Sequence, residues 1–206
     1  MPGDRPERFA KAAASSTDAV IIDLEDAVDG AFKEAARRNL LTHGVTGKPV
    51  LARINAASSE WMDGDLAVLA DARLDGVILA KAESADEIAA VAKAAGPGVA
   101  LIPLIETVLG LSRIDAILKA PQVLCAGFGS LDYGLDTGCE PGWEPLLHAR
   151  GLLVFASRLA GVAAPIDGVT PTLDDPVLVE EEARRARAFG FGGKLAIHPK
   201  QVAPIL

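Results

Sequence analysis

The chain has 206 residues, half of them apolar and only 4% aromatic, with 28 acidic against 20 basic residues and a formal net charge of −8. This length can bury one sizeable core, and a core made of Ala, Val, Ile and Leu favours an α/β fold over a β-sandwich. The acidic balance and the lack of any basic cluster disfavour nucleic acid or an anionic membrane as a partner.

Apolar segments alternate with helical ones along the whole chain. Strands are predicted to begin near residues 19, 49, 76, 99, 122, 164 and 193. Helices are predicted at 6–15, 31–41, a segment through Leu66 and Leu69 to Ala72, 84–95, 109–119, 146–160 and 174–190, and the segment at 130–145 reads as a long loop. Intervals of this size suit one strand and one helix each, which predicts parallel strands with right-handed crossovers.

Charged or polar side chains follow the predicted strands at their C-terminal ends. An open doubly wound sheet normally carries a Gly-rich phosphate turn after its first strand, whereas here that position holds the acidic Asp-Leu-Glu-Asp run at 23–26. A barrel instead gathers its functional groups at the C-terminal ends of several strands. The residues at these ends are Asp23, Glu25, Asp26, Arg53, Asn55, Lys81, Glu106, Asp132, Asp167 and His198.

The fold class predicted from this pattern is therefore a TIM (β/α)8-type barrel that forms a single domain over residues 1–206. Seven strands are one short of the eight that the fold requires, and the chain is shorter than the roughly 250 residues typical of it.

The carboxylates at separate strand ends suggest a hard divalent cation, Mg²⁺ or Mn²⁺, since oxygen ligands suit these ions. Glu106 and Asp132 are the first candidates, because each follows a strongly apolar strand and they lie on consecutive units. Arg53 and Lys81 are candidates for binding an anionic substrate. The alternative for Arg53 is that it only pairs with the acids at 23–26.

Other candidate groups carry weaker signals. His198 precedes a proline at a strand end, a setting that favours a hydrogen-bonded structural histidine over a ligand or base. Gly127 and Gly129 would let the backbone approach a ligand closely. Cys125 and Cys139 show no metal-type spacing and are expected to be reduced thiols.

No leader and no membrane span is expected. The N-terminal residues are charged and lack an apolar segment, and no stretch approaches the ~18–20 apolar residues that span a bilayer. We therefore expect a cytoplasmic protein.

Seven phrases, taken in order along residues 2–202, together resemble the citrate lyase beta-subunit-like family of phosphoenolpyruvate/pyruvate-type TIM barrels, whose relatives include malyl-CoA and citramalyl-CoA lyases. They are Pro-Gly-Asp-Arg-Pro-Glu-Arg-Phe at 2–9, Val-Ile-Ile-Asp-Leu-Glu-Asp-Ala-Val at 20–28, Arg-Ile-Asn at 53–55, Ile-Glu-Thr at 105–107, Gly-Phe-Gly-Ser-Leu-Asp at 127–132, Ala-Pro-Ile-Asp-Gly at 164–168 and Lys-Leu-Ala-Ile-His-Pro at 194–199.

The resemblance implies a Mg²⁺-dependent lyase that cleaves or forms a carbon–carbon bond next to an acyl thioester such as malyl-CoA or citramalyl-CoA, with an oxo acid as the second partner. It also implies roles for single residues. Glu106 and Asp132 match metal ligands, Arg53 matches the arginine that holds the oxo acid, and Glu25 and Asp26 line the outer shell of the metal site. Lys81, Gly129 and Ser130 are expected to contact substrate, and the protein is expected to form a homo-oligomer, a trimer or hexamer.

Two departures from the family pattern leave alternatives open. Family members usually carry a strand before the phrase that begins here at residue 2, and a C-terminal helical segment after the His-Pro phrase. We therefore expect an incomplete barrel or a natural start upstream of Met1. An aldolase acting on free 2-oxo acids and a non-catalytic subunit of a lyase complex are the alternative functions.

Overall fold

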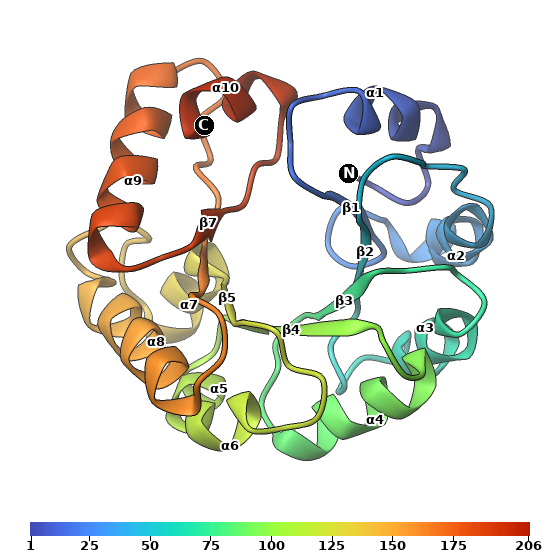
Figure 1. The fold of residues 1–206 in the computed structure, drawn as a ribbon, viewed down its shortest axis with the longest axis horizontal. Helices are drawn as coiled ribbons and strands as arrows, with labels where there is room; N and C mark the ends of the chain where they lie inside the picture. The colour runs from blue at the N-terminus through green and yellow to red at the C-terminus, as the bar shows by residue number, and fades with distance from the viewer.

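Seven parallel strands follow one another around a ring in sequence order, with the helices outside them (Figure 1). The computed structural model describes all residues, 1–206. The strands are β1 (Val20–Asp23), β2 (Val50–Ile54), β3 (Gly76–Leu79), β4 (Ala100–Ile105), β5 (Gly127–Phe128), β6 (Ile166–Asp167) and β7 (Gly193–Lys194). This curled parallel sheet confirms the prediction of a TIM-type barrel fold.

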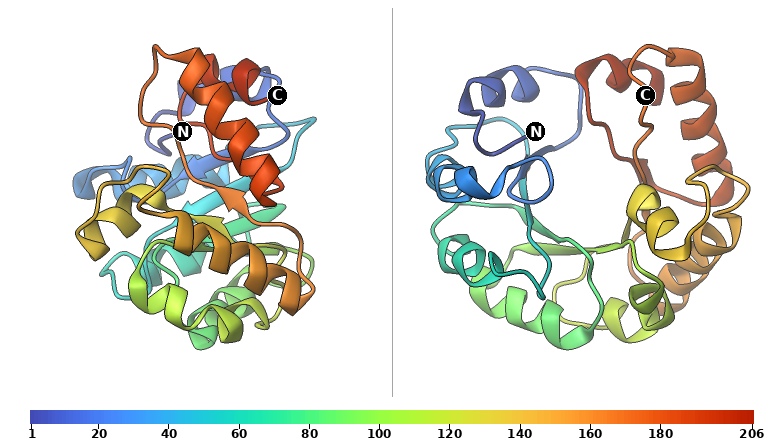
Figure 2. Two further views of the ribbon diagram at one scale, coloured as in Figure 1. Left: turned by 90° about the vertical axis from the view of Figure 1, so that its left-hand side faces the viewer. Right: turned by 180° about the vertical axis from the view of Figure 1, so that it is seen from behind.

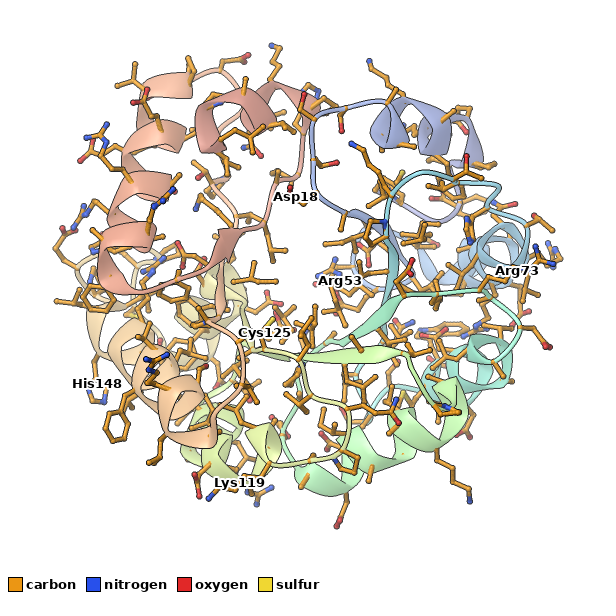
Figure 3. All side chains as sticks on the ribbon, in the orientation of Figure 1. Asp18, Arg53, Arg73, Lys119, Cys125 and His148 are labelled. Carbon is orange, nitrogen blue, oxygen red and sulfur yellow. The ribbon has the colours of Figure 1, made fainter.

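The strands β3 and β4 bury both of their faces, as expected for a parallel sheet covered by helices, whereas β7 has one exposed and one half-buried residue. Most of the core lies between the strands and the helices, with Ile22, Ile54 and Leu79 fully or almost fully buried. A second, smaller apolar cluster, built around Ile78, Ile102, Leu104 and Cys125, fills the inside of the ring. Figure 3 places Cys125 and Arg53 inside the ring of strands.

Ten α-helices surround the strands, and the two views of Figure 2 show them on the outside of the ring. They are α1 (Phe9–Ala13), α2 (Lys33–Leu41), α3 (Met62–Leu69), α4 (Ala85–Ala95), α5 (Val108–Ser112), α6 (Ile114–Leu118), α7 (Ser130–Thr137), α8 (Leu147–Ala160), α9 (Pro176–Phe189) and α10 (Val202–Ile205). Short 3₁₀ turns at Pro6–Arg8, Gly30–Phe32 and Pro199–Gln201 precede α1, α2 and α10.

Local sequence signals set several of these boundaries. Ser84 and Glu87 form a reciprocal capping box at the start of α4, as the Ser-x-x-Glu pattern predicts. The helix predicted at 109–119 is instead two short helices that meet at Arg113. The fifth and seventh strands are much shorter than predicted, with only an isolated bridge between Leu101 and Val123 extending the fifth.

The segment after β5 corrects the prediction of a long loop at 130–145. Residues Ser130–Thr137 form α7, which ends at Gly138 in the left-handed conformation that glycine adopts without steric cost. Two glycines close together, Gly134 and Gly138, make this segment resemble a loop in sequence. Gly134 packs against the carbonyl of Cys139, so the helix is held by its contacts rather than by its propensity.

The ring is not closed by strand pairing, because β1 and β7 are not hydrogen-bonded to each other. Pro2 forms a parallel bridge with Asp23 on the outer edge of β1, and the Met1 ammonium donates to the carbonyl of Ile21 at 2.8 Å. The gap in the ring lies between α1 and α10 (Figure 1). None of the helices is both long enough and apolar enough to cross a membrane.

Candidate active site and metal centre

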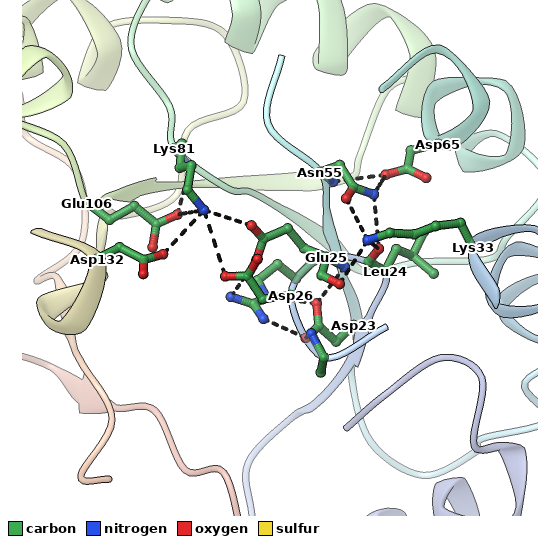
Figure 4. A network of polar contacts seen from close by, with 12 residues as sticks. Asp23, Leu24, Glu25, Asp26, Lys33, Asn55, Asp65, Lys81, Glu106 and Asp132 are labelled. Carbon is green, nitrogen blue, oxygen red and sulfur yellow. Dashed lines mark hydrogen bonds and ion pairs between the residues drawn. The ribbon is translucent and has the colours of Figure 1, made fainter. Parts of the chain in front are cut away.

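The carboxyl ends of β1 to β5 bring a cluster of charged side chains together, as shown in Figure 4. Glu106 lies directly after β4, and its side chain is only 3% exposed. The backbone N–H of Lys81 donates to Glu106 Oε1 at 2.8 Å. Burial raises the pKa of Glu106 to about 8, although the Lys81 charge and this hydrogen bond act in the opposite direction.

The Lys81 ammonium is the centre of the cluster. Its Nζ lies 2.8 Å from Glu25 Oε1, 3.3 Å from Asp132 Oδ2, 3.8 Å from Asp26 Oδ2 and 4.0 Å from Glu106 Oε1. Burial alone would lower the pKa of Lys81, but the hydrogen bond to Glu25 and the surrounding carboxylates raise it. One cation therefore faces four anions that come from the ends of β1 and β4 and from α7.

Arg53 occupies the other side of the Glu25 carboxylate. Its guanidinium donates to both oxygens of Asp23, at 2.8 and 2.5 Å, and its Nη1 lies 3.0 Å from Glu25 Oε2. Burial works against ionisation of Asp23, but the hydrogen bond and charge of Arg53 hold its pKa below the usual range. The pairing of Arg53 with the acids at 23–26, the alternative interpretation of this residue, is thus present, while the side chain remains 23% exposed.

Asp132 and Gly129 lie on the Glu106 side of the cluster. Asp132 lies in the first turn of α7, and its side chain is 28% exposed. A Cβ at Gly129 would overlap the Glu106 carboxylate, so only glycine leaves room for Glu106 in this position. Ser130 is buried, and its hydroxyl lies against Gly168. The structure therefore brings together one cluster of site residues: Glu25, Asp26, Arg53, Lys81, Glu106, Gly129 and Asp132.

A second layer of buried polar groups fixes the loop after β1. The Lys33 ammonium donates to the carbonyls of Leu24 and Glu25, at 2.6 and 2.9 Å, and to Asn55 Oδ1 at 2.8 Å. Asp65 accepts from both the backbone and side-chain N–H groups of Asn55, and it also pairs with Arg37. These contacts link the ends of β1 and β2 to α2 and α3.

Sequence reasoning did not identify Lys33, Asp65 or Arg37. All three lie within helices, and no pattern in the sequence distinguishes a buried charged side chain there from the exposed charged side chains around it. The strand-end rule did predict Asn55, although its role in the structure is to connect Lys33 with Asp65.

Two of the strand-end residues do not join the cluster. Asp167 is fully buried and pairs with Arg150 at 2.9 Å and with Lys194 at 3.6 Å. His198 accepts a hydrogen bond from the backbone N–H of Lys200, in agreement with a structural histidine. Both cysteines are free, and burial raises the pKa of Cys125 to about 11.

The donor set fits a magnesium ion better than a softer metal. No group of three or more His, Cys, Asp or Glu side chains has the arrangement of a complete metal cage. Mg²⁺ commonly takes one or two protein carboxylates and fills its remaining positions with water and substrate oxygens. Glu106 and Asp132 already approach one positive charge, the Lys81 ammonium, and the missing Cβ of Gly129 leaves space for the Glu106 carboxylate beside it.

The fold is a (β/α)-barrel, and its acidic and basic groups lie at the C-terminal ends of the strands. These two features place the chain in the class of barrel proteins that have a polar site at that end. Within this class, the chain belongs to the HpcH/HpaI aldolase/citrate lyase family, whose model matches residues 1–199. This match confirms the resemblance found in the sequence.

Two curated relatives are similar over nearly the whole chain. A citrate lyase subunit beta-like protein of Deinococcus radiodurans is 38% identical and covers 98% of this chain and 75% of the relative. A (3S)-malyl-CoA thioesterase of Cereibacter sphaeroides is 32% identical and covers 98% of this chain and 72% of the relative.

Solved structures of a protein from Mycobacterium tuberculosis are similar in fold. Its citrate lyase beta subunit, complexed with oxaloacetate and magnesium, matches with a TM-score of 0.88 and 33% identity over all of this chain and 92% of that chain. The M. tuberculosis protein in complex with magnesium, acetoacetate and coenzyme A matches with a TM-score of 0.89 and 33% identity. The match covers all of the present chain and 77% of the M. tuberculosis chain.

Proposed function

We propose that this chain is a Mg²⁺-dependent carbon–carbon lyase acting on a hydroxy-acyl thioester such as malyl-CoA or citramalyl-CoA, or catalysing the reverse condensation with an oxo acid. The observation that carries the proposal is the approach of Glu106 and Asp132 to a single positive charge beside Arg53 and Glu25. The magnesium, oxo acid and coenzyme A bound by the relative from M. tuberculosis support the choice of metal and substrate class.

In this proposal Glu106 and Asp132 hold the metal, and Mn²⁺ would suit the same oxygens. Bound there, Mg²⁺ supplies a Lewis acid for the carbonyl and carboxylate oxygens of a 2-oxo acid. Glu25 and Asp26 hold Lys81 and complete the acidic wall around the metal position.

Arg53 is the residue proposed to bind the anionic part of the substrate. Two of its five N–H groups donate to Asp23, and its Nη1 lies 3.0 Å from Glu25 Oε2 without a hydrogen bond, which leaves N–H donors for a ligand. Breaking the bond beside the acyl group places a negative charge on an enolate oxygen, and a guanidinium already fixed by Asp23 stabilises that charge without reorganising. The Gly129 backbone and the Ser130 hydroxyl are proposed to complete the substrate pocket.

The test is the Glu106→Gln variant, which keeps the size of the side chain and removes its charge. We expect it to lose Mg²⁺ binding in calorimetry and to lower malyl-CoA cleavage at least about 100-fold, because one of two metal ligands is gone. Glu181→Gln, at an exposed position on α9 outside the cluster, serves as the control. Full activity in Glu106→Gln would contradict the proposed metal site.

Thioester hydrolysis is the second candidate, favoured by the (3S)-malyl-CoA thioesterase among the relatives. Product analysis separates it from the lyase. A lyase releases an oxo acid and a shorter acyl-CoA from malyl-CoA, whereas a thioesterase releases free malate and coenzyme A. A parallel assay with free hydroxy-oxo acids tests the aldolase alternative.

A further inference from the structure

Lys81 is the only ion-pair partner of three of the four carboxylates around it. Glu106, Asp26 and Asp132 make no ion pair with any other Lys or Arg, while Glu25 also faces Arg53. Like charges this close repel one another unless a positive charge lies between them. The Lys81 ammonium therefore neutralises the same carboxylate oxygens that the proposed metal would bind.

The backbone at Lys81 holds the side chain in this place at some cost. Its φ is +48°, in the left-handed region that residues with a Cβ rarely adopt, and the cost of this conformation is on the order of 1 kcal/mol. The same turn directs the backbone N–H to Glu106 Oε1 at 2.8 Å and brings Nζ within 4.0 Å of that oxygen. Strain of this kind persists where the surroundings enforce it, which is typical of functional positions.

A magnesium ion on Glu106 and Asp132 would compete with this ammonium. The Lys81 Nζ lies 3.3 Å from Asp132 Oδ2 and 4.0 Å from Glu106 Oε1, so a cation held by these two carboxylates would share them with the ammonium. Two cations that share the same oxygens repel each other. Glu25, at 2.8 Å from Nζ, gives the ammonium a partner that remains available when the metal arrives.

We propose that Lys81 acts as a tethered cation that holds Glu106 and Asp132 in place in the metal-free protein and withdraws toward Glu25 and Asp26 when Mg²⁺ binds. This inference rests on the proposed magnesium site. It explains how four carboxylates can be assembled before the metal arrives, and it predicts that the protein binds Mg²⁺ less tightly than the same carboxylates would without the lysine.

The experiment measures Mg²⁺ affinity by titration calorimetry for the wild type, Lys81→Met and Lys81→Gln. All variants are measured in the same buffer at the same pH. Removing the competing charge is expected to tighten Mg²⁺ binding about tenfold. Lys81→Arg, which keeps the charge, and Lys119→Met, which removes an exposed lysine on α6 paired only with Asp115, should bind Mg²⁺ like the wild type.

Thermal unfolding gives a second readout that does not depend on turnover. Without metal, Lys81→Met and Lys81→Gln should unfold at a lower temperature than the wild type, because their carboxylates lack a counter-charge, and Mg²⁺ should raise their Tm more than it raises that of the wild type.

Failure of the inference and failure of the proposed function can be told apart. If the wild type binds Mg²⁺ through Glu106 but the Lys81 variants bind it equally or less tightly, the magnesium site stands and the tethered-cation role is overturned. If the wild type shows no Mg²⁺ binding that depends on Glu106, both proposals are overturned.

Discussion

At the scale of single residues, the site depends on one position where a side chain is missing. The φ of Gly129 is −89°, an ordinary value, so its backbone conformation does not require glycine. What requires glycine is the Glu106 carboxylate, which occupies the space where a Cβ would be. Gly129 therefore acts on the site by steric means, and a single methyl group is enough to test it.

Gly129→Ala should push Glu106 away from Asp132 and weaken Mg²⁺ binding about tenfold or more, as misplacing one ligand of a metal usually does. Overpacking of this buried position should also cost about 1–3 kcal/mol of unfolding free energy. Calorimetry and urea unfolding measure the two effects. Gly142→Ala is the matched control, since its Cβ would meet only Pro145 at 3.5 Å. Unchanged Mg²⁺ affinity in Gly129→Ala would show that Glu106 does not hold the metal from this position.

The charged residues of the cluster were within reach of sequence reasoning for a simple physical reason. Parallel strands place all their C-terminal ends at one side of the sheet, so an acid or base that ends an apolar run is directed to the same region as the others. This argument located Glu25, Arg53, Lys81, Glu106 and Asp132. The same rule could not separate Asp167 from them, because a buried ion pair with Arg150 leaves no mark in the sequence.

At the scale of elements, the buried contacts of Lys33 tie two strand ends to two helices. Lys33 begins α2, and its three acceptors belong to the loop after β1 and to Asn55 after β2. Asn55 in turn binds Asp65 of α3. Glu25, which holds both Lys81 and Arg53, is thereby fixed through its own backbone carbonyl.

Lys33→Met should lower the free energy of unfolding by about 3 kcal/mol, because it leaves the buried Asn55 Oδ1 without its donor and the buried Asp65 with one fewer nearby cation. Urea unfolding measures the change. Lys93→Met, on the exposed face of α4, should stay within about 0.5 kcal/mol of the wild type. A similar small change in Lys33→Met would mean that the loop after β1 holds its position without this network.

The helix α7 shows where element prediction from sequence fails. Its eight residues include Gly134 and end at Gly138, so local propensity argues for a loop. The helix forms because Gly134 can approach the carbonyl of Cys139 closely and Tyr133 packs in the core beside Phe128. Contacts of this kind depend on residues far along the chain, whereas the capping box of α4 lies within four residues and was predicted correctly.

At the scale of the whole molecule, the ring consists of a half with longer strands, β1 to β4, and a half with shorter strands, β5 to β7. The strands β1 to β4 have four to six residues each, whereas β5, β6 and β7 have two residues each. The halves are joined by two paired positions, Leu104 with Gly127 and Ile105 with Phe128, and by the isolated bridge between Leu101 and Val123. Glu106 follows the last strand of the long half, and Asp132 follows the first strand of the short half.

A metal held by Glu106 and Asp132 would therefore bridge the two halves across the short pairing of β4 with β5. Without Mg²⁺, hydrogen exchange should be slowest in β1 to β4 and fast in β7, which has no strand on its other edge. Mg²⁺ should then slow exchange chiefly in residues 127–137, by up to about 100-fold where opening releases the metal and Mg²⁺ is present at a hundredfold excess over its Kd. Residues 193–198 should change little, because they lie at the far edge of the short half and hold none of the proposed ligands. Exchange measured peptide by peptide with mass spectrometry decides this, and protection that appears equally in all strands would contradict a metal that joins β4 to α7.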